Sequence, residues 1–163
     1  MIIFGIDPGI ANTGYALIKK NEENLSKILE VNTFTTKKNP LEYRLNQIYE
    51  FLKNKAISYS PDYFATEKLY FNKNSKTALI IEEVRGIILL LAAQLSIPIF
   101  QYTPLEVKRT LTLYGKASKF EVREVLENML NTKLPKSDDA CDAVGVAICH
   151  FLKFEENKKC LLI

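Results

Sequence analysis

The first part of the chain alternates short apolar runs with polar connections, which is typical of β-strands. Residues 1–7 form a β-branched and aromatic run that ends at Asp7-Pro8-Gly9, where turn-forming residues predict the end of a buried strand. Two more strands are predicted over residues 13–19 and 26–35, joined by the polar stretch 20–24. We expect these three strands to be antiparallel neighbours.

From Pro40 onward the apolar residues are spaced three or four apart, which predicts an amphipathic helix that ends before Pro61. A strand over residues 61–67, a helix over about 75–96 and a short strand over 98–102 follow. This strand-helix-strand alternation favours parallel pairing in the second half of the sheet. The pattern therefore predicts a mixed five-stranded sheet, with three antiparallel strands and then two parallel ones, flanked by helices.

Three further helices are predicted, over residues 104–111, 119–130 and 137 to about 153. This order of elements is the one found in the ribonuclease H-like α/β fold, a likeness that concerns architecture and not function. A chain of 163 residues has the size of one ordinary domain. We therefore expect a single domain over residues 1–154 and a short, frayed C-terminal tail over 155–163.

Composition excludes several classes of protein. With 47% hydrophobic and 25% charged residues, the chain has the composition of a globular protein and not of a disordered one. Cys141, Cys149 and Cys160 lack the Cys-x-x-Cys spacing, and His150 is the one histidine, so neither a disulfide framework nor a zinc site is supported. The longest apolar run, residues 87–93, is too short to span a bilayer. We expect a cytoplasmic protein without a targeting or membrane segment.

The net charge and the basic residues do not by themselves indicate a function. The formal net charge is +3, and lysine and arginine residues recur in small groups along the chain. Surface lysines usually serve only solvation, so these groups indicate nucleic-acid binding only if a reactive site lies beside them.

Four carboxylates stand where a lone charge would be poorly placed, at the end of an apolar strand pattern or the start of an apolar helix pattern: Asp7, Glu67, Asp139 and Asp142. Phosphodiester hydrolysis can use two metal ions about 3.5–4 Å apart, one at each end of the displacement. Carboxylate oxygens are the ligands that magnesium prefers. If the fold brings the four together, they predict a magnesium-dependent nuclease.

Each carboxylate also has a simpler explanation when taken alone. Asp139 and Asp142 are three residues apart on one helix face, behind a possible cap at Ser137, and acids are common in a first helical turn. Glu67 alone would be an exposed strand end. The Gly-x-Asp-x-Gly motif around Asp7 also occurs in ATPases of the actin and sugar-kinase type, although those need two such half-domains and this chain has one copy.

Taken together, four motifs resemble the bacterial RuvC Holliday-junction resolvases over nearly the whole chain. They are Gly5-Ile6-Asp7-Pro8-Gly9 with Thr13-Gly14-Tyr15, the run from Pro61 to Glu67, Val84-Arg85-Gly86, and Asp139-Ala140-Cys141-Asp142-Ala143. The resemblance implies that Asp7, Glu67, Asp139 and Asp142 are the catalytic, metal-binding set. It also implies two Mg²⁺ ions per active site, with Mn²⁺ as a substitute.

The resemblance further implies a homodimer that holds four-way junction DNA. Such a dimer makes two symmetric nicks that leave 5′-phosphate ends, in homologous recombination and DNA repair, and a branch-migration complex of the RuvA and RuvB type is a further expected partner. The helix over residues 78–95 is more apolar than one buried stripe requires, which agrees with burial on two sides. A helix buried in a monomeric core would show the same excess.

Several residues match positions that the family uses against DNA. Tyr70 matches an aromatic that stacks near the opened junction centre, where stacking is worth about 1–3 kcal/mol, and Phe71 is the other candidate. Lys108 and Lys119 match positions that contact phosphate. Weaker candidates are Lys73, Lys76, Arg85 and Arg109, of which Arg85 has an ion pair with Glu82 or Glu83 as its alternative role.

Two other functions stay open at this point. One is a related ribonuclease H-like nuclease that acts on RNA or an RNA/DNA hybrid, and the other is a junction-binding protein without cleavage activity. The chain departs from the family pattern at Ala16, where glycine is usual, and at Cys141, where alanine is common, and it lacks the basic C-terminal extension of some members. None of these departures concerns a proposed metal ligand.

Overall fold

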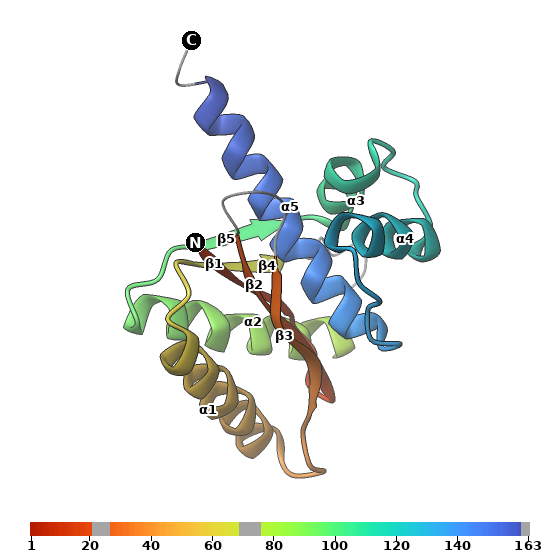
Figure 1. The fold of residues 1–163 in the computed structure, drawn as a ribbon. Helices are drawn as coiled ribbons and strands as arrows, with labels where there is room; N and C mark the ends of the chain where they lie inside the picture. The colour runs from red at the N-terminus through yellow and green to blue at the C-terminus, as the bar shows by residue number, and fades with distance from the viewer. Residues whose placement is uncertain (21–26, 69–75, 161–163) are drawn as a thin grey trace.

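A mixed five-stranded sheet runs through the molecule in the order β3-β2-β1-β4-β5 (Figure 1). The computed structural model describes residues 1–20, 27–68 and 76–160. Its strands are β1 (Ile2–Asp7), β2 (Asn12–Lys19), β3 (Lys27–Thr35), β4 (Tyr63–Glu67) and β5 (Ile99–Tyr102). β1, β2 and β3 are antiparallel neighbours, whereas β4 pairs in parallel with both β1 and β5. The predicted sheet is confirmed.

Helices cover both faces of this sheet. α1 (Leu41–Tyr59) and α2 (Lys76–Gln94) lie against one face, and α5 (Asp138–Cys160) crosses the other (Figure 1). α3 (Pro104–Thr112) and α4 (Lys119–Leu130) pack against α5 and against each other. Among the described residues, none of these helices combines the length and the apolar character needed to cross a membrane.

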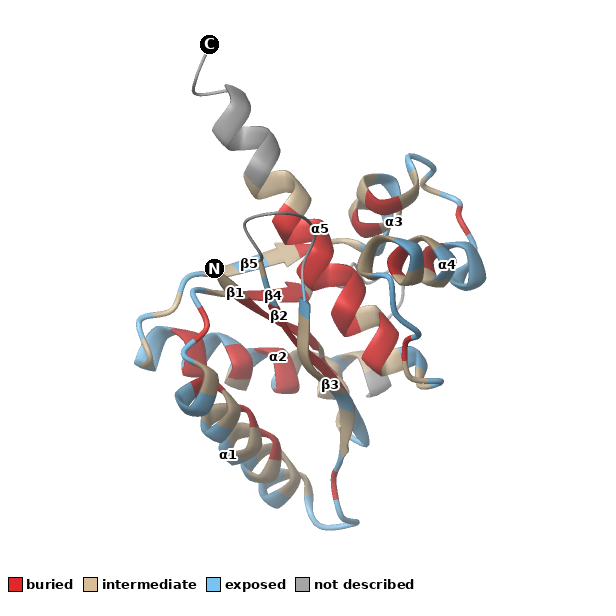
Figure 2. Ribbon diagram, viewed as in Figure 1, coloured by how far each residue is buried: buried red, intermediate tan, exposed pale blue. Residues whose placement is uncertain are grey.

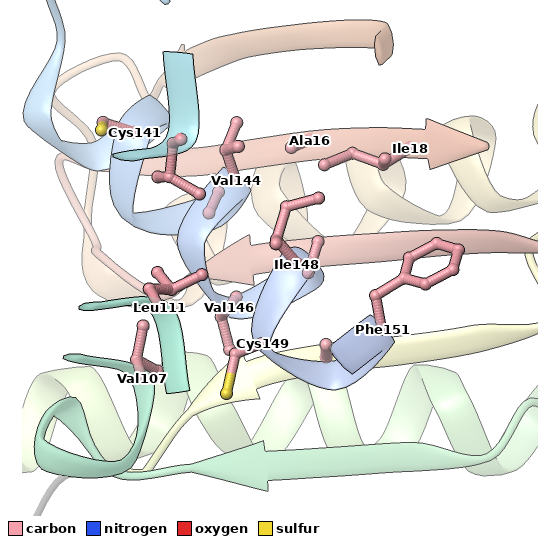
Figure 3. Close-up of a cluster of buried hydrophobic side chains, with 14 of the residues drawn as sticks. Ala16, Ile18, Val107, Leu111, Cys141, Val144, Val146, Ile148, Cys149 and Phe151 are labelled. Atoms are coloured by element: carbon pink, nitrogen blue, oxygen red, sulfur yellow. The ribbon is translucent and has the colours of Figure 1, made fainter. Parts of the chain in front are cut away.

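The period-two alternation of the strands divides the core into two halves. Phe4, Ile6 and Leu17 are fully buried on the side of α1 and α2. Their neighbours Ile3 and Ile18 are buried on the opposite side, against α5. Figure 2 shows that α5 is buried along much of its length, and Figure 3 shows its side chains packed between the sheet and α3. Because successive strand residues face opposite ways, one short strand supplies both cores.

Local signals explain most element boundaries. α4 begins where predicted, with a capping box in which Ser118 and Glu121 satisfy each other's backbone N–H groups. A similar box between Thr103 and Glu106 begins α3. The other boundaries agree with the sequence pattern to within about two residues, apart from the end of α5.

The prediction that the last helix ends near residue 153 was wrong, because α5 continues to Cys160. Residues 153–160 contain neither glycine nor proline, so nothing in their backbone chemistry stops the helix. The division of the chain into a domain over 1–154 and a tail over 155–163 stays a prediction.

Candidate metal-dependent nuclease site

Asp7 and Glu67 are placed side by side by the sheet. β1 and β4 are parallel neighbours with Ile6 opposite Thr66, so the next residue of each strand lies at the same edge. Both side chains are partly exposed there, while the strand residues before them are buried. The buried strands therefore hold two carboxylates at the carboxyl end of the sheet, where α/β proteins usually bind ligands.

The start of α5 brings Asp139, in its first turn, and Asp142, one turn further on, to the same edge. Ser137 stands before this turn as predicted, and its Oγ accepts a bond from the backbone N–H of Ala140 at 3.4 Å. The same Oγ lies 2.7 Å from the Thr33 hydroxyl, which ties the start of α5 to β3. Acids in this turn also face the positive end of the helix, which stabilises their charge.

Two glycines allow α5 to lie this close to the sheet. A Cβ at position 14 would lie 1.9 Å from the backbone oxygen of Asp139, and one at position 5 would lie 2.1 Å from that of Ala143. Any side chain at either position would displace the helix. Gly14, in the motif Thr13-Gly14-Tyr15, therefore helps to set the position of Asp139.

The fold forces these carboxylates to share a poorly solvated space. Burial, followed by repulsion from Glu67, Asp142 and Asp139, raises the pKa of Asp7 to about 8. Burial and repulsion from Asp142 raise the pKa of Glu67 to about 7, and burial also raises that of Asp139. Lys119 opposes each of these shifts. The four groups thus form one electrostatic cluster, in which Asp7 and Glu67 hold protons that they would release on binding a cation.

Glu67 lies between two hollows in the surface. One is lined by Asp7, Glu67 and Asp139, and the other, of about 320 Å³, is lined by Glu67 and Asp142 together with Lys108 and Lys119. Carboxylates are thus available on both sides of Glu67, an arrangement suited to two cations that share this residue.

The donor set fits hard divalent ions. All four groups offer carboxylate oxygens, the ligands that magnesium and manganese prefer. In the parts of the chain that the structure describes, no three acidic, histidine or cysteine side chains stand close enough together to hold one ion by themselves. Water and substrate phosphate would therefore complete the coordination, which is usual for magnesium.

The predicted DNA-contacting residues meet different outcomes. Lys108 and Lys119 line the hollow that contains Glu67 and Asp142, so the structure brings both to the site. Arg109 is exposed beside Lys108 on α3 but does not line that hollow, and Lys76 is the first residue of α2. Tyr70, Phe71 and Lys73 lie outside the described residues.

Arg85, one of the weaker candidates, has partners within the protein. Its guanidinium bonds Glu82 on its own helix and Gln101 on β5. Its side chain is buried, so the ion-pair interpretation of Arg85 is confirmed.

Arg123 and Asp138 were not singled out by the sequence pattern. Arg123, on α4, donates to the backbone oxygen of Pro135 at 2.7 Å and so holds the segment that leads into α5. Asp138 accepts from Lys119 at 3.3 Å, and both residues line the hollow. A charged residue on the polar side of an amphipathic helix gives no signal of such a role.

Cys141 and His150 are not exposed at the site. Cys141 borders the same hollow but is buried, and burial raises the pKa of its thiol to about 11. His150 is buried further along α5 and lies 2.7 Å from the Tyr102 hydroxyl. Both side chains are packed within the protein and are not available as groups of the site.

Comparisons with known proteins agree on one family. The profile of the family described as crossover junction endodeoxyribonuclease RuvC matches residues 3–150. A crossover junction endodeoxyribonuclease RuvC from Pseudothermotoga lettingae is 43% identical over 151 residues, which are 92% of this chain and 93% of the relative.

Solved structures show the same architecture. The RuvC structure from Thermus thermophilus superimposes with a TM-score of 0.87 at 24% identity, covering 96% of this chain and 97% of the other. The T. thermophilus protein in complex with a Holliday junction substrate gives a TM-score of 0.86 at 23% identity, with 96% of each chain covered. The predicted ribonuclease H-like fold class is thereby confirmed.

Proposed function

The chain belongs to the RuvC family of crossover junction endodeoxyribonucleases, and from this premise we propose that it cleaves four-way DNA junctions as a Holliday-junction resolvase. The observation that carries the proposal is the convergence of four carboxylates from β1, β4 and α5 at one edge of the sheet. Lys108 and Lys119 line the hollow that contains Glu67 and Asp142, and such positive charge is needed to bind a phosphodiester. Cleavage is hydrolytic and leaves a 5′-phosphate that ligase can seal.

We assign Asp7, Glu67, Asp139 and Asp142 as the ligands of two Mg²⁺ ions, for which Mn²⁺ can substitute. When bound, such ions would activate a water molecule and neutralise charge on the departing 3′ oxygen. The four carboxylates are held on regular elements, because β1 and β4 end and α5 begins at this edge. Their raised pKa values mean that Asp7 and Glu67 release protons when they become ligands.

Lysines of the second hollow would hold the scissile phosphate. Lys108 projects from α3 and Lys119 from the first turn of α4, so two separate elements place positive charge opposite the carboxylates. Arg109, Lys76 and Lys73 would extend this contact along the DNA backbone, each adding salt-dependent affinity. Tyr70 follows Glu67 in the chain and would stack on a base at the opened centre of the junction.

We also propose that two copies associate through α2. This helix leaves Leu79 and Leu90 exposed, at 63% and 53% of their surface, on the side away from the core. Gly86 lies between these two leucines and Ala93 lies three residues beyond Leu90; both are exposed, and a Cβ at Gly86 would meet nothing within 4 Å. Gly86, Leu90 and Ala93 follow one another at spacings of four and three, so a second helix could approach closely along this part of α2. A two-fold dimer matches the two-fold symmetry of a four-way junction.

The test compares cleavage of a labelled four-way DNA junction, a linear duplex and an RNA/DNA hybrid in Mg²⁺. The proteins are the wild type, Asp7→Asn, Glu67→Gln and the control Glu124→Gln, which removes an exposed carboxylate of α4 outside the site. Sequences at the junction centre are varied, so that one unfavourable sequence does not hide activity. We expect paired nicks at the junction with the wild type and the control, and none with the site variants.

Other outcomes would point to the two alternatives. Cutting of the hybrid alone would move the chain to the ribonucleases. Tight junction binding without cleavage, across all sequences and with both Mg²⁺ and Mn²⁺, would indicate a non-catalytic junction-binding protein.

A further inference from the structure

Lys119 is held between two carboxylates that differ in kind. Its Nζ lies 3.1 Å from Oδ2 of Asp142 and 3.3 Å from Oδ2 of Asp138. Asp142 belongs to the four-carboxylate cluster, because it raises the pKa of Asp7 and Glu67. Asp138 is not among the groups that raise those two pKa values, although it raises that of its neighbour Asp139, and its side chain is largely exposed. One partner of Lys119 is therefore a proposed metal ligand, and the other is not.

Contacts with α4 should keep Asp138 in place when a divalent ion binds the four carboxylates. Asp138 is the first residue of α5, and its Oδ1 lies 4.0 Å from Arg123. Arg123 is itself tied to the backbone before α5 through the oxygen of Pro135. The Asp138 side chain is 64% exposed, so it faces the mouth of the hollow and not the protein interior.

The two contacts of Lys119 respond in opposite ways to a divalent ion. An ion bound to Asp142 would replace the attraction between Asp142 and the ammonium by repulsion between two cations. Asp138 would then be the remaining carboxylate within reach of Lys119. Without it, the ammonium would either stay on Asp142 and oppose the ion, or move away into solvent.

We propose that Asp138 is a positioning residue for Lys119. By accepting a hydrogen bond from the ammonium, Asp138 holds it at the rim of the site and weakens its contact with Asp142. A divalent ion can then bind Asp142 while the ammonium stays beside the scissile phosphate. This inference rests on the proposed function, since it gives Lys119 a phosphate to contact. It explains why an exposed aspartate stands directly before the first carboxylate of α5.

A simpler role for Asp138 is a favourable charge in the first turn of a helix. That role does not depend on Lys119, whereas a positioning role disappears when Lys119 loses its charge. A double-mutant cycle separates the two, because coupling between neighbouring residues appears as non-additivity. Lys119→Met suits the cycle, since it keeps an unbranched side chain and removes the ammonium.

The first readout is Mn²⁺ binding to the full chain without DNA, followed by electron paramagnetic resonance. We expect Asp138→Asn to weaken binding by about two- to fivefold, the range for one exposed ion pair. Lys119→Met should strengthen binding, because it removes a competing cation from Asp142. In the Lys119→Met background, Asp138→Asn should change binding no more than the control Glu124→Gln does. An equal loss in both backgrounds would overturn the proposal, as would no loss at all in the wild-type background.

The second readout separates positioning from DNA affinity. In single-turnover cleavage of the four-way junction at saturating protein, Asp138→Asn should reduce the rate by about two- to fivefold and leave the junction Kd within twofold. The same change in the Lys119→Met background should have no further effect on the rate. A wild type that cleaves no junction would refute the proposed function. The double-mutant cycle of Mn²⁺ binding tests the positioning of Lys119 separately, because it needs no cleavage.

Discussion

Asp7 is the residue whose ionisation the fold changes most among the four carboxylates. Its pKa rises from the ordinary 3.8 to about 8, first through burial and then through repulsion from Glu67, Asp142 and Asp139. Between these two values the folded protein binds a proton that the unfolded chain has lost. Folding stability from this group is therefore greatest at low pH and falls as the pH rises toward 8.

Removal of this charge should stabilise the metal-free protein while it abolishes cleavage. At pH 8 without divalent ions, we expect Asp7→Asn to raise the free energy of unfolding by on the order of 1–3 kcal/mol. The wild type should lose stability between pH 6 and pH 8, and the variant should lose less. Urea unfolding at both pH values measures this, with Glu124→Gln as the control. A less stable Asp7→Asn protein would contradict the electrostatic account.

Divalent ions should offset the loss of stability that repulsion among the carboxylates causes at high pH. Mg²⁺ bound to the folded site stabilises the wild type according to its concentration, and more strongly at pH 8 than at pH 6, where protons compete for Asp7 and Glu67. In thermal melts, increasing Mg²⁺ should raise the Tm of the wild type and leave that of Asp7→Asn nearly unchanged. Equal shifts in the two proteins would show that Mg²⁺ acts elsewhere on the surface.

At the scale of elements, the docking of α5 on β1 and β2 decides whether the site exists. β1 and β4 deliver Asp7 and Glu67 through sheet pairing alone. Asp139 and Asp142 reach the same edge only because α5 lies against the backbone of Gly5 and Gly14. The position of the helix is thus set by the absence of two side chains as much as by the apolar residues of its buried face.

Gly14→Ala should therefore damage both stability and activity. The added Cβ would lie 1.9 Å from the backbone oxygen of Asp139, so α5 must shift. We expect a loss of about 1–3 kcal/mol in unfolding free energy and a large loss of junction cleavage. Gly145→Ala is the matched control within α5, because its Cβ would meet Val107, Leu111 and Leu126 at 3.6–3.8 Å, an ordinary contact distance. An active Gly14→Ala protein would show that the site tolerates a displaced helix.

At the scale of the whole molecule, α2 has two roles: Ile81 lines the hollow that holds Asp7 and Glu67, whereas Leu79 and Leu90 are exposed on its surface. The carboxylates occupy one edge of the sheet, whereas α2 covers one face and turns Leu79 and Leu90 away from it. We expect two copies that associate through Leu79 and Leu90 to leave both carboxylate sites open. Each copy would then act on its own strand of a symmetric junction.

Leu90→Glu should convert the proposed dimer into a monomer. A charge on the apolar stripe of α2 would be desolvated in the dimer and solvated in the monomer, so association should weaken by at least about tenfold. Sedimentation equilibrium over a range of concentrations measures this. Ile57→Glu, at an exposed apolar position of α1, is the control and should leave association unchanged. A wild type that stays monomeric at micromolar concentration would refute the dimer.

Much of the fold could be predicted because its signals are local. Period-two apolar runs, the capping sequences at Ser118 and Ser137, and prolines near helix ends indicate each element within a few neighbouring residues. The candidate carboxylates could be found the same way, since each interrupts or begins an apolar pattern. The end of α5 was missed because residues 153–160 contain neither glycine nor proline, so no local signal marks where the helix stops.

The sequence by itself thus determined the order and type of the elements, the mixed sheet and the four acidic positions, because these depend on side-chain periodicity and on charges placed at strand and helix ends. Only the tertiary structure decided that Asp7 and Glu67 share poorly solvated space, that Gly14 admits α5, and that Asp138 stands beside Lys119 and Arg123. Those relations join residues far apart in the chain. Their strength depends on distance and burial, quantities that a linear pattern does not contain.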